Sequence, residues 1–155
     1  MPETQRLHSV DRGYGSGGRQ RSEKTQMIAV DTNVLARYIT NDDPVQAGRA
    51  LKLMRRENVL ILKTVLLELE WVLRAGYRFD RPSILRAIEG LLGLPNAASE
   101  DPIQIKAALE WYEAGLDFAD ALHIASSQRA DRFATFDDKL AKRAKGLVNL
   151  EVSTV

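Results

Sequence analysis

From residue 27 onward, short apolar runs alternate with longer segments that carry helix start and stop signals. Residues 27–30 and 59–62 are apolar throughout and predict buried strands. The pattern predicts further strands over 132–136 and 148–152, with a loop at 95–100. It predicts helices over residues 33–39, 44–56, 64–75, 80–92, 101–115, 117–130 and 138–145.

Helix boundaries are marked by capping residues. Asp43 is a predicted N-cap with Pro44 at the first helical position, and Thr64 and Asp80 are predicted caps of later helices. Strands separated by helices predict an α/β fold with a mostly parallel central sheet and helices on both faces. Such sheets bind ligands beyond the carboxyl ends of their strands.

Composition limits the chemistry of any site. The 155 residues include no cysteine and two histidines, His8 and His123, so a metal would have to be held mainly by oxygen. No apolar run approaches a membrane span, and the N-terminus lacks the apolar core of a signal peptide. We therefore expect a soluble, cytoplasmic protein without a membrane partner.

The first 26 residues differ from the rest of the chain. They are rich in glycine and carry five basic and three acidic side chains, whereas residues 27–155 carry 17 basic and 18 acidic ones. We interpret residues 1–26 as a disordered extension, a leader or an upstream start, with Met27 as an alternative initiator. Residues 27–155, with a net charge of −1, lack the basic excess typical of nucleic-acid binders.

Two aspartates follow predicted strands. Asp31 comes after residues 27–30, and Asp137 comes after residues 132–136. We expect both carboxylates to face one crevice at the sheet edge. The alternative is that each only caps the next helix, although Asp138 is the better candidate for that cap.

Two glutamates in the segment TVLLELEWVL have different surroundings. Glu70 lies four residues before Arg74, which is the spacing of a surface ion pair. The helical neighbours of Glu68 are mostly apolar and include no base, so its carboxylate needs a cation, several donors or a proton. Glu68 is therefore a candidate site residue.

Asp117 and Asp120 lie three residues apart at the start of a predicted helix and share one face. Asp117 fits an N-cap as well as a site residue. Asp120 lies inside the helix, where capping explains it less well. His123 is interpreted as a packed or hydrogen-bonded residue.

Several converging carboxylates would repel one another, because like charges 4 Å apart cost about 4 kcal/mol at an effective dielectric of about 20. A divalent cation removes this cost. An all-oxygen set of ligands favours Mg²⁺ or Mn²⁺, and a metal-bound water near a phosphate can be the nucleophile of an in-line displacement.

Four segments together resemble the PIN-domain ribonucleases of the VapC toxin type, over about Met27 to Val155. In chain order they are AVDTNVLARYI, LLELEWVLRAGY, GLDFADALHIA and FATFDDKLAKRA. The resemblance implies a PIN-like three-layer fold over residues 27–155. It also implies Mg²⁺- or Mn²⁺-dependent endonucleolytic cleavage of RNA. The implied catalytic and metal-binding acids are Asp31, Glu68, Asp120 and Asp137, with Asp117 as an additional ligand and Thr32 and Asn33 as supporting residues.

The resemblance also implies partners. Toxins of this type usually form homodimers, or larger toxin–antitoxin assemblies, and are silenced by a cognate VapB-like antitoxin. Phosphatases of the haloacid dehalogenase type require a second aspartate where this chain has Asn33, and receiver domains require one where it has Lys63 and Thr64. A catalytically silent PIN-like binding or regulatory subunit is the remaining alternative.

Overall fold

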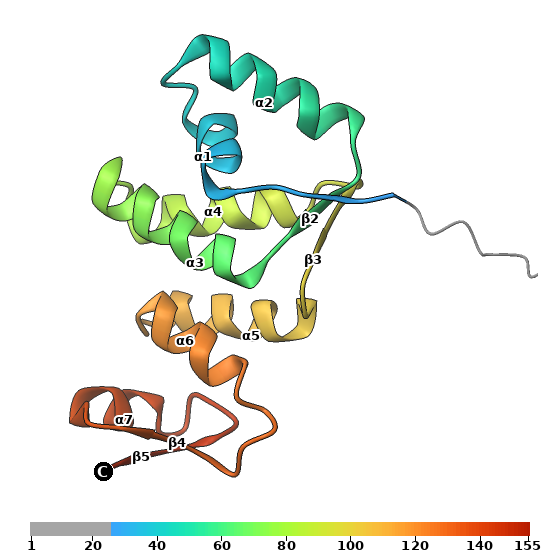
Figure 1. Ribbon diagram of the computed structural model, residues 1–155. Coiled ribbons are helices and arrows are strands. Elements are labelled where there is room, and N and C mark those ends of the chain that lie inside the picture. The colour runs from blue at the N-terminus through green and yellow to red at the C-terminus, as the bar shows by residue number, and fades with distance from the viewer. Residues whose placement is uncertain (1–25) are drawn as a thin grey trace, which may run out of the picture.

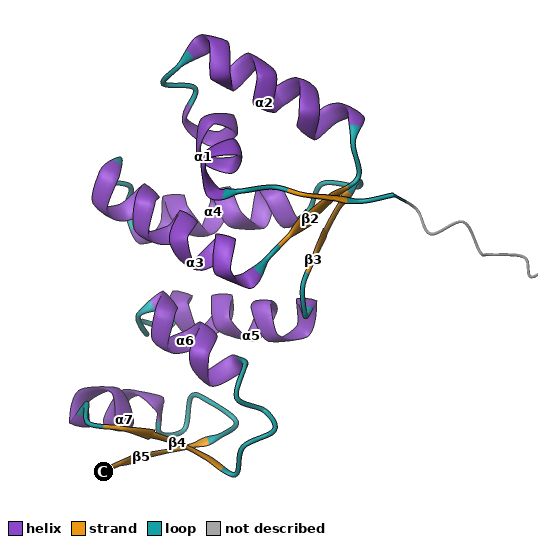
Figure 2. Ribbon diagram, viewed as in Figure 1, coloured by secondary structure: helices purple, strands orange, loops and turns teal. Residues whose placement is uncertain are grey.

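The computed structural model describes residues 26–155, so the predicted extension lies almost wholly outside the described residues. Helices dominate the chain and short strands lie between them (Figures 1 and 2). The strands are β1 (Ile28–Ala29), β2 (Val59–Ile61), β3 (Ala97–Ser99), β4 (Arg132–Thr135) and β5 (Glu151–Thr154). The helices are α1 (Thr32–Thr40), α2 (Pro44–Arg56), α3 (Lys63–Trp71), α4 (Arg81–Leu92), α5 (Pro102–Glu113), α6 (Phe118–Ala125) and α7 (Asp138–Ala144), with a π-helix, η1 (Val72–Gly76), continuing α3.

Every pairing between the described strands is parallel, which confirms the predicted α/β class. The strands form two sheets, however, in the orders β1-β2-β3 and β4-β5. In the view of Figure 1, α5 and α6 separate the first sheet from β4, β5 and α7. Strand β3 occupies part of the segment 95–100, which was predicted to be a loop. The sequence did not indicate this strand, because Ala-Ala-Ser has little strand propensity.

Several predicted helix starts are confirmed and others are wrong. Asp43 caps α2 ahead of Pro44, and Asp80 caps α4 by accepting a hydrogen bond from the Ser83 N–H. Thr64 does not cap α3, which begins one residue earlier without a side-chain cap. Asp137, rather than Asp138, caps α7.

The core lies among α3, α4, α5 and α6. Leu66, Leu69 and Leu73 are fully buried at the spacing of one helical stripe. Helices α5 and α6 meet through Tyr112 and Phe118, whose rings pack edge to face with centroids 5.4 Å apart. Among residues 26–155, none of the helices combines the length and apolarity needed to cross a bilayer.

Arg81, at the start of α4, anchors the turn between α5 and α6. Its guanidinium lies 4.2 Å from the ring centroid of Tyr112. The same group donates to the carbonyl of Tyr112 and, at 2.6 Å, to that of Leu116. Leu116 directly precedes Asp117, so this contact fixes the backbone that delivers the first carboxylate of α6.

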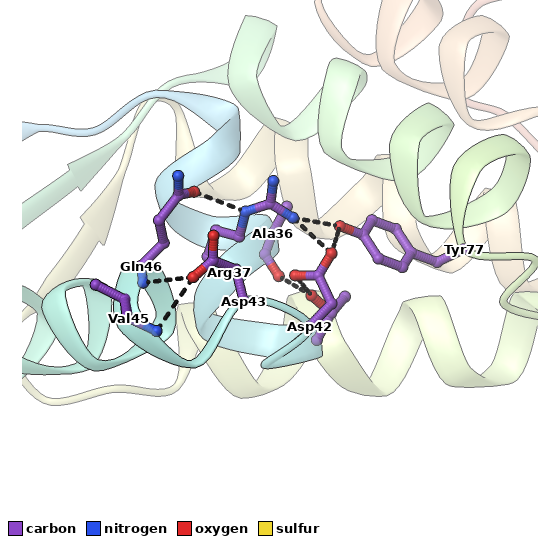
Figure 3. Close-up of polar contacts among 8 residues, drawn as sticks. Ala36, Arg37, Asp42, Asp43, Val45, Gln46 and Tyr77 are labelled. Carbon is purple, nitrogen blue, oxygen red and sulfur yellow. Dashed lines mark hydrogen bonds and ion pairs between the residues drawn. The ribbon is translucent and has the colours of Figure 1, made fainter.

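The π-helix ends at a polar cluster that ties it to the α1–α2 loop (Figure 3). The Tyr77 hydroxyl donates to Asp42 Oδ2 at 2.7 Å, and Arg37 Nη1 donates to the same oxygen at 2.6 Å. Arg37 also donates to Gln46 on α2 at 2.9 Å, and the Thr40 hydroxyl donates to Asp42 Oδ1 at 3.0 Å. One carboxylate thus joins the end of α1 to Tyr77, which lies 35 positions further along the chain.

These hydrogen bonds, led by that of Tyr77, lower the pKa of Asp42 from 3.8 to about 2. Because the folded pKa is depressed, ionised Asp42 stabilises the fold above the ordinary pKa, and this stabilisation is lost as the pH falls toward 2.

In the Tyr77→Phe variant, NMR titration should find the Asp42 pKa closer to its ordinary value. The Tyr38→Phe variant should leave it near 2, and an unchanged pKa in Tyr77→Phe would contradict the hydrogen-bond account.

Candidate functional site

Asp31 stands two residues beyond β1 with its side chain exposed. Its Oδ1 accepts a hydrogen bond from the backbone N–H of Asn33 at 2.8 Å and caps α1. Because a carboxylate offers about four lone-pair positions on two oxygens, this cap leaves capacity for a further interaction. The contact of Asn33 with Asp31 is made by its backbone. Its side chain instead lines a cavity between α1 and α2.

Thr32 connects the first acid to the second. Its side chain is buried, and its hydroxyl donates to Glu68 Oε2 at 2.8 Å. The bond joins α1 to α3 across 36 positions of sequence. Glu68 is therefore in direct contact with Thr32, the residue that follows Asp31.

The predicted surroundings of the two glutamates are wrong. Glu68 is exposed, whereas Glu70 is buried with a relative accessibility of 3%. The two lie about 200° apart around the helix, so one faces solvent when the other faces the core. Glu70 falls on the buried stripe because it is four residues after Leu66.

Glu70 nevertheless forms the predicted ion pair with Arg74. The Nε–Oε1 distance is 2.8 Å, and the Tyr112 hydroxyl donates to the same carboxylate at 3.3 Å. The pair raises the pKa of Arg74, and burial together with the charge of Glu70 raises the pKa of Tyr112 to about 12. This contact locks α3 against α5. It is structural, although its arginine reaches the cavity described below.

Three aspartates gather at the first turns of α6 and α7. Asp117 Oδ1 accepts from the N–H of Ala119 at 2.9 Å, and Asp137 Oδ1 accepts from that of Lys139 at 2.9 Å. Both are N-caps, which was one of the two predictions for each. Asp120 is half-buried in the first turn of α6. Burial first, and then the charges of Asp117 and Asp137, raise its pKa.

A cavity of about 340 Å³ connects α3 with the start of α6. Two of the predicted acids, Glu68 and Asp117, line it together. Arg74 also lines it, and the charge of Asp117 contributes to the raised pKa of this arginine. The remaining lining residues are Thr64, Leu67, Glu70, Trp71 and Ala119.

The structure therefore links the predicted acids in stages. Asp31 adjoins Thr32, which holds Glu68. Glu68 shares a cavity with Asp117, and the charges of Asp117 and Asp137 both act on Asp120. The prediction that Asp31 and Asp137 lie at the edge of one sheet was wrong, because β1 and β4 belong to separate sheets.

Within residues 26–155, no three aspartate, glutamate, histidine or cysteine side chains converge closely enough to hold a metal ion by themselves. Mg²⁺ usually takes only one or two carboxylates and keeps several waters. The hard oxygen donors present fit that mode of binding. Burial, followed by the charges of Asp117 and Asp137, raises the pKa of Asp120, and a dication bound there would favour its ionised form.

Two features of the site were missed from the sequence. Glu70 could have been placed in the core from its spacing to Leu66. Trp71 lines the cavity and is 59% exposed, although tryptophan in an apolar helix normally suggests burial. Its position three residues after Glu68 was the available signal.

Comparison with known proteins gives one family. The PIN domain matches residues 28–146, a span that includes all seven predicted site residues. No curated protein matches the chain. PIN domains are generally metal-dependent nucleases, which supports a hydrolase acting on nucleic acid. The chain belongs to the PIN-domain family.

Proposed function

We propose that this protein is a divalent-metal-dependent endoribonuclease that hydrolyses RNA phosphodiester bonds. The observation that carries the proposal is the half-buried carboxyl of Asp120, whose pKa is raised first by burial and then by the charges of Asp117 and Asp137. A surface that only bound a partner would have no need for charges that oppose one another. Accumulated carboxylates suit a site that recruits a dication to a phosphate.

The proposed ligands of Mg²⁺ or Mn²⁺ are Asp31, Glu68, Asp120 and Asp137, with Asp117 beside them. A bound dication supplies positive charge to the phosphate and acidifies a nucleophilic water. The protein contributes the positioning of these ligands. The Thr32 hydroxyl fixes one oxygen of Glu68, and the N–H of Asn33 fixes one oxygen of Asp31.

Helix N-termini hold the remaining acids. The capping bonds of Asp117 and Asp137 orient each carboxylate before any ion arrives. The positive end of each helix dipole also offsets part of the repulsion between them. The carboxylates of Asp117 and Asp137 are therefore oriented by the protein itself, before a metal ion binds.

We further propose that the nuclease is the toxin of a toxin–antitoxin pair, acts in the cytoplasm, forms homodimers and is silenced by a VapB-like antitoxin. The support is the resemblance of four segments, in order, to VapC-type toxins. A catalytically silent PIN-like subunit is the alternative. It predicts that the acids can be replaced without consequence.

The Asp31→Asn variant tests the chemistry. Asparagine caps a helix as well as aspartate does, so the fold should be kept while the charge is lost. We expect Mg²⁺-dependent cleavage of RNA to fall by at least roughly 100-fold. Chelation of the metal should abolish wild-type cleavage.

The Asp43→Asn variant is the matched control for this experiment. Asp43 is also a helix N-cap, at the start of α2, and lies outside the acidic group. Its variant should cleave at the wild-type rate. Equal cleavage by Asp31→Asn and Asp43→Asn would refute the assignment of Asp31.

Growth of bacteria that express the chain tests the toxin role. We expect wild-type protein to arrest growth and Asp31→Asn to be harmless at equal expression. Co-expression of a small DNA-binding protein encoded beside the chain's own gene should restore growth. Arrest by both forms, or by neither, would contradict the proposal that toxicity comes from cleavage of RNA.

A further inference from the structure

The indole of Trp71 occupies an unusual position. It ends α3 with 59% of its surface exposed, whereas Leu66 and Leu69 on the same helix are fully buried. The other tryptophan, Trp111, is buried in the core with 7% exposure. Burial of a large apolar side chain stabilises a fold, and this stabilisation is largely forgone at Trp71.

A single exposed apolar side chain needs no explanation by itself. Trp71, however, lines the cavity that contains Glu68 and Asp117. About 60° separates Trp71 from Glu68 around the helix, since residues three apart are neighbours on one face. An aromatic ring therefore stands beside two of the acids proposed to act on RNA.

Arg74 is the one cation among the residues that line this cavity. Its side chain is 49% exposed, and its Nε donates to buried Glu70 at 2.8 Å. The guanidinium carries five N–H donors, so pairing with one carboxylate leaves donors for a second anion. Glu70 thus holds the guanidinium of Arg74 among the residues that line the cavity with Trp71, and its remaining N–H groups can donate to a phosphate oxygen.

We propose that this cavity is a nucleotide subsite in which Trp71 stacks on an unpaired RNA base and Arg74 contacts the adjoining phosphate. The inference rests on the proposed nuclease function and deepens it by assigning two residues to the recognition of one nucleotide. A base within a duplex has both faces covered by its neighbours and offers no face to Trp71. The subsite therefore selects segments whose bases are free to turn outward.

Fluorescence tests the stacking without any cleavage. In EDTA, an oligoadenylate of ten nucleotides should quench the fluorescence of the exposed Trp71 in wild-type protein. The Trp71→Phe variant retains only the shielded Trp111 and should show no quenching. Its affinity should lie between those of wild type and Trp71→Ala, because phenylalanine still offers an aromatic face. Quenching that persists in Trp71→Phe would overturn the proposal.

Affinities measured by anisotropy give the size of the effect. Trp71→Ala should bind the oligoadenylate roughly 5- to 150-fold more weakly than wild type. An abasic oligomer of the same length keeps the phosphates but lacks bases, and it should bind both proteins equally. A blunt RNA duplex should likewise not distinguish them.

Ile103→Ala is the matched control, because Ile103 is another exposed apolar side chain, 85% accessible, outside this cavity. It should bind like wild type. Equal affinity of Trp71→Ala and Ile103→Ala for oligoadenylate would overturn the proposal. So would Trp71 emission that shifts with protein concentration alone, because the ring would then be covered by a second copy of the chain.

Cleavage in Mg²⁺ separates this inference from the proposed function. If wild type cleaves the oligomer and Trp71→Ala cleaves it with unchanged kcat/KM, the subsite is wrong and the nuclease stands. If base-dependent quenching occurs but wild-type protein does not cleave RNA, the subsite is supported and the proposed nuclease function is wrong.

Discussion

The burial of Asp120 close to the charges of Asp117 and Asp137 is the constraint on which the proposed site depends. At an effective dielectric of about 20, two such charges 4 Å apart oppose each other by about 4 kcal/mol. Two of the three are held by N–H groups at helix starts, where the backbone stabilises negative charge. Asp120 makes no capping bond, and burial, followed by the charges of the other two, raises its pKa. The fold thus keeps an electrostatic strain that a dication would relieve.

Helix α3 connects the core to this charge. One of its faces carries Leu66 and Leu69 into the interior together with Glu70, which holds Arg74. The other face presents Glu68, fixed by Thr32, to the cavity shared with the start of α6. The same helix therefore sets both the stability of the α3–α5 contact and the position of the second acid. Arg81 completes the arrangement by anchoring the turn that leads into α6.

Local signals predicted most of the helices, because capping residues such as Asp43 and Asp80 act through bonds to their own neighbours. Asp31 and Asp137 were chosen as candidates because each follows an apolar run, and Asp117 and Asp120 because they lie three residues apart at a helix start. What failed depended on distant partners. The break between the two sheets has no local signature, and neither does β3. The orientation of α3 was misjudged because apolar residues surround Glu68 in sequence, while the stripe that starts at Leu66 decides which face is buried.

Binding of Mn²⁺, followed by electron paramagnetic resonance, tests the central claim that these acids jointly hold a dication. Wild-type protein should bind Mn²⁺ in competition with Mg²⁺, and Asp120→Asn should bind it at least roughly 10-fold more weakly. Asp43→Asn, which loses a carboxylate elsewhere, should bind like wild type. Mn²⁺ affinity that is the same in all three proteins would contradict the account.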